Sequence, residues 1–166
     1  MLLRTHGITR ENMEENHGNW YYEMVELVFN YRLTDFQSAL GITQLAKNNK
    51  GVERRNEISA AYKKAFEGKI KFQDLPAGAY NAHHLFVIEV ENRKELYEYL
   101  HSNNILVQIH YITVNTFPYY KKIGYADANL LNAEKYYSRC ISLPMYPTLS
   151  HKEQKYVIEK VLSFVK

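Results

Sequence analysis

The residues with the clearest chemical potential are an asparagine and an arginine in FNYRLTDFQSALGITQL, residues 29–45. Asn30 and Arg32 alternate with two aromatic residues, so they share one face if this segment is extended. Helix signals follow at once, and the first turn of a helix presents backbone N–H groups without partners. An amide, a guanidinium and free N–H groups together suit a bound anion. An ion pair between Arg32 and a local acid such as Asp35 explains the arginine equally well.

A second polar pair interrupts the apolar stretch ILVQIHYI, residues 105–112. Gln108 and His110 are two positions apart, so they lie on one face of the strand that this stretch predicts. Polar groups without partners are costly on a buried strand. The pair therefore either faces solvent or meets a ligand.

Other reactive residues do not form a self-sufficient active site. The glycine spacing of a P-loop or a dinucleotide fold is missing, and so is a nucleophile elbow. His83 and His84 point to opposite faces of a strand, so we expect one in the core and one exposed rather than a chelating pair. Cys140 is expected to be a small buried apolar residue. The sequence predicts no metal site.

Composition narrows the class of protein. The 166 residues fit one domain, and 14% aromatic with 23% charged residues is typical of a soluble globular chain. No apolar run approaches the roughly 20 residues of a membrane helix. A formal charge of +3, from 21 basic and 18 acidic residues, does not predict a nucleic-acid partner. The single cysteine favours a reducing, cytoplasmic location.

The first half of the chain is organised around one long helical pattern. Residues 1–19 predict a loop-rich opening, and residues 21–29 predict a strand. Thr34 and Gln37 have capping-box spacing, so a helix begins there and its apolar pattern extends to residue 66. Gly51 disfavours a helix interior. Either one helix covers 35–66 or two helices meet near Gly51.

The second half alternates strands with helices, which predicts a compact two-layer α/β unit. The expected elements, in order, are a strand at 84–90, a helix capped by Asn92 and Glu95 that ends near Asn103, a strand at 105–112, a short helix at 132–143, and a helix capped by Ser150 and Glu153 that continues through Val165.

Several motifs resemble one family in order along the whole chain. NYRLTDFQSALGITQL closely resembles the Asn-Tyr-Arg motif of the DegT/DnrJ/EryC1/StrS family of pyridoxal-phosphate sugar aminotransferases. LRTHGITR and WYYEMVELVFNYR are most similar to the branch that serves pseudaminic acid synthesis. HLFVI, QIHYITV, PYYKKIGY and SLPMYPTLS then match in sequence order. Thr113 and Asn115 depart from the proline and histidine that usually follow the HY pair, on the substrate side.

The resemblance implies a fold and a set of site residues. The fold is the C-terminal small domain of a fold type I transferase, with a long connector helix and a small antiparallel sheet packed on helices. Residues 1–33 correspond to the tail of the large domain, 34–66 to the connector and 67–166 to the small domain. Asn30 and Arg32 bind the phosphate of pyridoxal 5'-phosphate across a homodimer. A UDP-linked sugar is contacted by the segment Gln108, Ile109, His110 and Tyr111.

The resemblance also implies what is not in this sequence. The family's Schiff-base lysine precedes the matched segment, so we expect the 166 residues alone to be inactive and to contribute no catalytic residue. The implied activity of the whole enzyme is transfer of an amino group, with glutamate as the expected donor, to a UDP-linked 4-keto-deoxysugar. The alternative is a non-catalytic binding or dimerisation module derived from the small domain.

Overall fold

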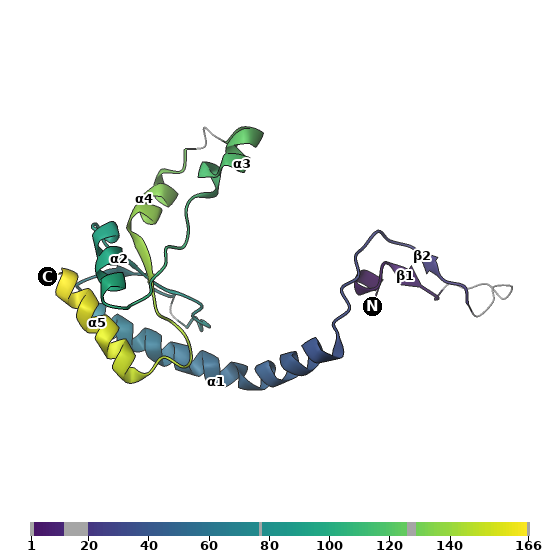
Figure 1. Cartoon of the computed structure of the whole chain (residues 1–166), viewed down its shortest axis with the longest axis horizontal. Coiled ribbons are helices and arrows are strands. Elements are labelled where there is room, and N and C mark those ends of the chain that lie inside the picture. Colours follow the sequence, from purple (N-terminus) through teal and green to yellow (C-terminus); the bar gives the residue numbers. More distant parts are fainter. Residues whose placement is uncertain (1, 12–19, 77, 126–128, 166) are drawn as a thin grey trace. The chain divides into compact units, whose positions relative to one another are not determined.

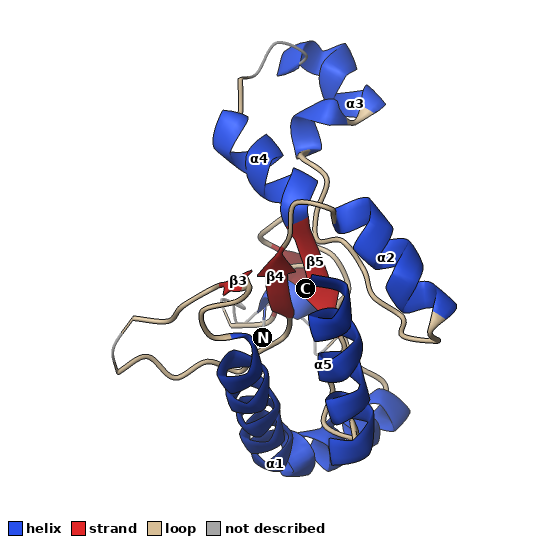
Figure 2. Cartoon of the chain, turned by 90° about the vertical axis from the view of Figure 1, so that its left-hand side faces the viewer, coloured by secondary structure: helices blue, strands red, loops and turns tan. Residues whose placement is uncertain are grey.

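A computed structural model describes residues 2–11, 20–76, 78–125 and 129–165. The chain forms two compact units, Met1–Lys47 and Asn48–Lys166, which are considered separately below. Part of the predicted loop-rich opening, residues 12–19, lies outside the described residues. The predicted α/β class is confirmed, since helices surround a small antiparallel sheet in the second unit (Figure 2).

The first unit contains short elements and much exposed apolar surface. A 3-10 turn, η1 (Leu2–Arg4), precedes β1 (Ile8–Thr9), which pairs antiparallel with β2 (Glu23–Met24). The predicted strand at 21–29 is therefore wrong except at its two β2 residues. Leu27 is 90% exposed and Phe29 is 72% exposed. The apolar residues of this segment therefore pack against no core that would stabilise a longer strand.

Gly7 is required where this first unit folds back on itself. Its φ is +66°, and a Cβ there would lie 1.9 Å from the carbonyl oxygen of Glu26. The backbone oxygen of Gly7 accepts a hydrogen bond from the Val25 N–H at 2.9 Å. A side chain at this position would therefore separate the two segments.

Helix α1 (Asp35–Phe66) is continuous, which answers the question raised by Gly51. The predicted capping box is confirmed: the Gln37 N–H donates to Thr34 Oγ1 at 3.3 Å, and the Thr34 N–H donates to Gln37 Oε1 at 2.9 Å. A Cβ on Gly51 would lie 3.4 Å from Pro147 Cγ, close to ordinary van der Waals contact, so the loop that contains Pro147 packs against the helix at this point. The buried face after Gly51 offsets the roughly 1 kcal/mol cost of the glycine.

The sheet of the second unit has the strand order β3–β4–β5, with both pairs antiparallel. These strands are β3 (Lys71–Phe72), β4 (Phe86–Glu89) and β5 (Cys140–Leu143). Strand β4 lies within the predicted 84–90 strand, which is thus confirmed. The predicted helix at 132–143 is right only in part, because α4 (Leu131–Arg139) ends where β5 begins. All four β5 residues are buried, and a short, fully buried run has no period that separates strand from helix.

Helices α2 (Arg93–Ser102) and α5 (His151–Val165) complete the core with the C-terminal half of α1 (Figures 1 and 2). The end of α2 at its C-cap Asn103 is as predicted, but the Asn92 side chain makes no cap hydrogen bond. In sequence, α2 and α4 are separated by the short elements η2 (Val114–Thr116), α3 (Pro118–Tyr120) and η3 (Lys121–Tyr125), and η3 contains two residues with non-helical backbone angles. Fully buried core side chains include Ile58, Tyr62, Phe66, Ile88, Leu96, Leu100, Ile141 and Val161.

No helix in the described ranges is long and apolar enough to cross a membrane.

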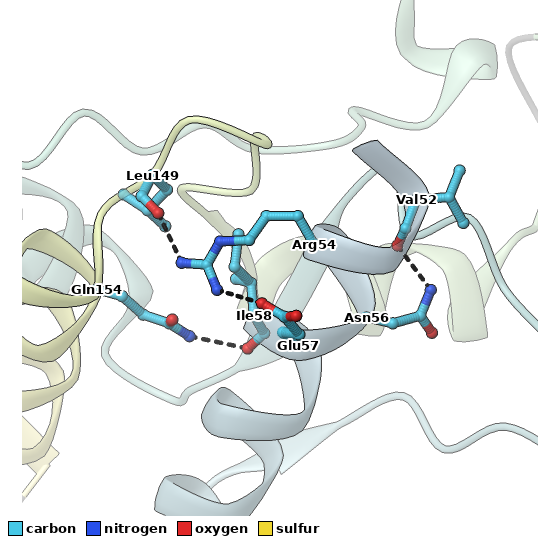
Figure 3. Close-up of polar contacts among 7 residues, drawn as sticks. All are labelled: Val52, Arg54, Asn56, Glu57, Ile58, Leu149 and Gln154. Atoms are coloured by element: carbon cyan, nitrogen blue, oxygen red, sulfur yellow. Dashed lines mark hydrogen bonds and ion pairs between the residues drawn. The ribbon is translucent and has the colours of Figure 1, made fainter. Parts of the chain in front are cut away.

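Polar contacts join α5 and the preceding loop to α1 (Figure 3). The buried Gln154 amide donates to the Ile58 carbonyl at 2.8 Å. Arg54 donates to the Leu149 carbonyl at 2.7 Å and pairs with Glu57 at 2.8 Å. These bonds fix the start of α5 against the middle of α1.

The cap of α5 predicts a dependence of stability on acid. The Ser150 N–H and hydroxyl donate to Glu153 Oε2 at 2.9 and 2.6 Å, which confirms the predicted cap and lowers the pKa of this carboxyl. Because the pKa of Glu153 is lower in the folded state than in the unfolded state, its carboxylate stabilises the folded chain at pH values above the unfolded-state pKa. This contribution to the free energy of unfolding is lost as pH falls through the folded-state pKa. We expect Glu153→Gln to flatten the acid limb of a plot of Tm against pH, whereas Glu98→Gln, at an exposed position of α2, should leave it unchanged.

Candidate functional site

The first candidate site is the segment that leads into α1. Residues 29–31 run beside 4–6: Asn30 bridges Thr5, and the Tyr31 N–H donates to the Arg4 carbonyl at 2.9 Å. The predicted strand face of Asn30 and Arg32 is thus replaced by a single bridge and an extended chain. Asn30 Oδ1 accepts the Arg32 N–H at 3.3 Å, so the Asn30 NH₂ group stays available as a donor.

Arg32 is exposed, and its guanidinium has no hydrogen bond or ion pair among the described residues. The alternative explanation, a local pair with Asp35, is therefore not the arrangement seen. Thr34 caps the Gln37 N–H, but helix geometry leaves the N–H groups of Asp35 and Phe36 without intrahelical partners. A free guanidinium, an amide NH₂ and two helix N–H groups within residues 30–36 are the kinds of donor that bind a phosphate.

The second candidate site is a pocket of about 400 Å³ in the second unit, which we call the histidine pocket. Both polar residues predicted from the 105–112 stretch line it. Its other polar lining residues are His84 from the loop before β4, Tyr97 and His101 from α2, and Ser142 from β5. None of its described lining residues carries a carboxylate, an ammonium or a guanidinium. Imidazole, amide and hydroxyl groups beside an aromatic ring suit an uncharged polar ligand group, such as a base or sugar hydroxyls.

The predicted strand at 105–112 is wrong, although its alternation is real. Ile105 and Val107 are buried, whereas Gln108 makes only an isolated bridge to Ser142. The two backbone bonds of that bridge, from Gln108 N and from Ser142 N, measure 3.4 and 2.8 Å. This segment is therefore an extended loop beside the edge of β5. Its side chains alternate between buried and exposed as in a strand, but its backbone does not form a continuous set of β-sheet hydrogen bonds.

His110 owes its position to Ser142, which sequence reasoning missed. His110 Nδ1 lies 2.8 Å from Ser142 Oγ, and Ser142 is 4% exposed. Gln108 Oε1 instead accepts the neighbouring Ile109 N–H at 2.9 Å. Ile109 and Tyr111 do not line the histidine pocket, and Tyr111 is 68% exposed. The structure thus gathers two of the four predicted sugar-binding residues in one pocket.

We expect Ser142→Ala to remove the partner of His110 and to lower the free energy of unfolding by about 1 kcal/mol, the typical net value of a neutral hydrogen bond. Urea unfolding measures this cost, and imidazole ¹⁵N shifts of His110 report the lost contact. Ser138→Ala, which truncates an exposed serine on α4, is the matched control. Unchanged His110 shifts in the Ser142 variant would contradict the assigned contact.

The remaining candidates have structural roles. His83 is 8% exposed while His84 is exposed, as predicted, and burial together with Lys63 lowers the pKa of His83. Cys140 is fully buried, and burial raises the pKa of its thiol, so it remains a protonated apolar residue. Within the described ranges, no group of three or more His, Cys, Asp or Glu side chains could hold a metal ion.

These features define an α/β chain with a phosphate-type donor set before a long helix and a polar pocket beside a small sheet. Residues 1–162 match the DegT/DnrJ/EryC1/StrS aminotransferase family, and the chain belongs to this family. The resemblance drawn from its motifs is therefore confirmed.

Three relatives illustrate the match. The UDP-4-amino-4,6-dideoxy-N-acetyl-beta-L-altrosamine transaminase of Campylobacter jejuni (strain 81-176) is 34% identical over 99% of this chain and 44% of the relative. Helicobacter pylori PseC, an aminotransferase involved in the biosynthesis of pseudoaminic acid, is 27% identical with a TM-score of 0.83, over 98% of this chain and 44% of that chain. The PLP form of the putative sugar aminotransferase Spr1654 from Streptococcus pneumoniae is 26% identical with a TM-score of 0.85, over 99% and 42%. The chain spans less than half the length of the curated relatives it matches.

Proposed function

We propose that this chain serves as the connector helix and small domain of a pyridoxal-phosphate sugar aminotransferase. The observation that carries the proposal is Arg32, an exposed guanidinium without a described partner, placed in the family's motif directly before α1. Asn30 and Arg32 bind the cofactor phosphate in a neighbouring subunit, so the active form is a homodimer. Pyridoxal phosphate, when bound, supplies the electron sink needed for moving an amino group.

The substrate is a UDP-linked 4-keto-deoxysugar of surface-glycan synthesis, with glutamate as amino donor and the pseudaminic acid branch as the favoured pathway class. The names of the Campylobacter and Helicobacter relatives support the UDP-linked sugar and the pseudaminic acid branch. In the chain itself, Gln108 and His110 orient the nucleotide sugar by hydrogen bonds from the histidine pocket, and Tyr111 contacts it from the exposed side. A cytoplasmic location is part of the same proposal.

The 166 residues alone are expected to be inactive, because none of their lysines stands in the Schiff-base motif. The test is a fusion of this chain behind the part of the Campylobacter jejuni relative that it does not cover. We expect amino transfer from glutamate to a UDP-4-keto sugar by this fusion enzyme and none by the chain alone. Turnover by the chain alone with added cofactor, and one lysine trapped by borohydride, would overturn the proposal.

A non-catalytic binding or dimerisation module is the second candidate, favoured by the self-contained core of the second unit. It predicts that the isolated chain is monodisperse and binds a UDP-sugar without turnover. The fused form would then also fail to transfer an amino group. The mass of the native product, measured by immunoblot in source cells, shows whether this segment is made within a longer enzyme or as a 19.6 kDa chain.

A further inference from the structure

Three consecutive residues of α1 donate hydrogen bonds to backbone carbonyls of distant loops. Arg54 reaches Leu149, and Asn56 Nδ2 donates to the Asn81 carbonyl at 3.0 Å as well as to Val52 within the helix. Figure 3 shows that Arg54 and Asn56 leave the helix on different sides. Arg55 lies between them and makes the largest number of these loop contacts.

Arg55 joins two loops through one nitrogen atom. Its Nη1 donates to the carbonyl of Met145 at 2.9 Å, of His83 at 3.1 Å and, more weakly, of His84 at 3.4 Å. No carboxylate pairs with Arg55 in the described ranges. A full positive charge is thus directed at carbonyl dipoles, which strengthens these bonds relative to neutral ones.

The two loops held by Arg55 are walls of the histidine pocket. His84 precedes β4 and Met145 follows β5, and both line the pocket. His83 has a φ of 48°, a left-handed conformation that is unfavourable for a residue with a Cβ and persists only when the surroundings hold it. The His83 N–H donates to Asn81 Oδ1 at 2.8 Å, and the His83 carbonyl accepts a hydrogen bond from Arg55 Nη1.

We propose that Arg55 is a positioning residue that keeps these two walls of the histidine pocket at the separation needed for ligand binding. It touches no ligand itself and acts through the backbone of residues 83–84 and 145. Helix α1 thereby sets the shape of a pocket that contains none of its own residues. The part of the inference that concerns affinity for a nucleotide sugar rests on the function proposed above.

The first test needs no ligand. Hydrogen–deuterium exchange is compared in the wild-type chain, Arg55→Met, Arg55→Lys and the control Arg54→Met, which removes a neighbouring arginine that holds Leu149 outside this pocket. We expect Arg55→Met to accelerate exchange about tenfold in segments 82–85 and 143–146, as the loss of a charge-assisted hydrogen bond implies. Arg54→Met should leave both segments protected. Equal protection in Arg55→Met and wild type would overturn the inference.

The second test uses UDP as the probe, with amide shifts of residues 84, 108–110 and 142 followed by NMR. We expect about tenfold weaker binding by Arg55→Met, partial recovery in Arg55→Lys and wild-type binding by Arg54→Met. Equal affinity of Arg55→Met and wild type would reject the role in binding. Absence of UDP binding by the wild-type chain would count against the proposed sugar contact, and the exchange data alone would then decide the role of Arg55.

Discussion

Replacing Phe66 with alanine will lower the free energy of unfolding of the second unit by about 3–5 kcal/mol, as measured by urea denaturation. Phe66 is fully buried at the end of α1, stacked on Tyr62 at 5.8 Å and 6.5 Å from the ring of Phe86. Truncation removes contacts to the helix and the sheet at once and leaves a cavity. Since a domain is stable by only about 5–15 kcal/mol, we expect a large fall in the urea midpoint.

Phe36→Ala is the matched control, because it makes the same change in the same helix at a side chain that is 81% exposed. Its effect should stay within about 0.5 kcal/mol, as for other surface substitutions. Similar costs at both positions would show that residue 66 is not part of the core described above. The comparison thus separates loss of packing from any change in helix propensity.

Arg32→Ala in the fusion enzyme will weaken retention of pyridoxal phosphate about 10- to 100-fold, the range expected for loss of charge-assisted hydrogen bonds. Arg32 is free to meet a phosphate because it has no described partner in its own chain. Arg32→Lys retains the charge but loses the paired donors, so its effect should be intermediate. Equilibrium dialysis with cofactor absorbance measures the affinity directly.

Arg10→Ala serves as the control, since Arg10 is an exposed arginine of the same unit outside the Asn-Tyr-Arg motif. It should leave cofactor affinity unchanged. Unchanged affinity in the Arg32 variant would remove the phosphate role from this residue. Equal weakening in both variants would point to general electrostatic attraction rather than a specific site.

Local signals predicted the helix termini well where the capping side chains contact each other. Thr34 with Gln37 and Ser150 with Glu153 form reciprocal caps, and the spacing alone carries that information. The continuity of α1 through Gly51 could not be read in this way. It depends on the buried face near Ile58 and on a loop brought close by the fold, both of which are tertiary.

The strands were harder to predict because pairing partners are distant in sequence. The four residues of β5 are all buried, so they continue the helical pattern of α4 without a visible break. Residues 105–112 show the opposite error, since alternate burial of an extended loop imitates a strand. Strand β5 has a four-residue register with β4, whereas residues 105–112 make one bridge to β5. In both cases the pairing with a distant segment decides the structure.

Contacts between residues distant in sequence also limited the prediction of the histidine pocket. Gln108 and His110 were detectable because they are polar residues within an apolar run. Ser142, which holds His110, and Arg55, which holds the loops, gave no such signal. Each contacts atoms at least 28 positions away, so only the folded chain brings them to the pocket.

Cys140 gives this molecule a built-in reporter of its own opening. It is the chain's single cysteine, and its side chain is fully buried in β5, the edge strand that pairs with β4 and carries Ser142. A thiol reagent can therefore reach it only after that strand separates from its neighbours. The rate of thiol labelling therefore measures how often β5 opens. Because β5 also carries Ser142, each such opening disrupts the sheet and the histidine pocket at the same time. No engineered probe is needed.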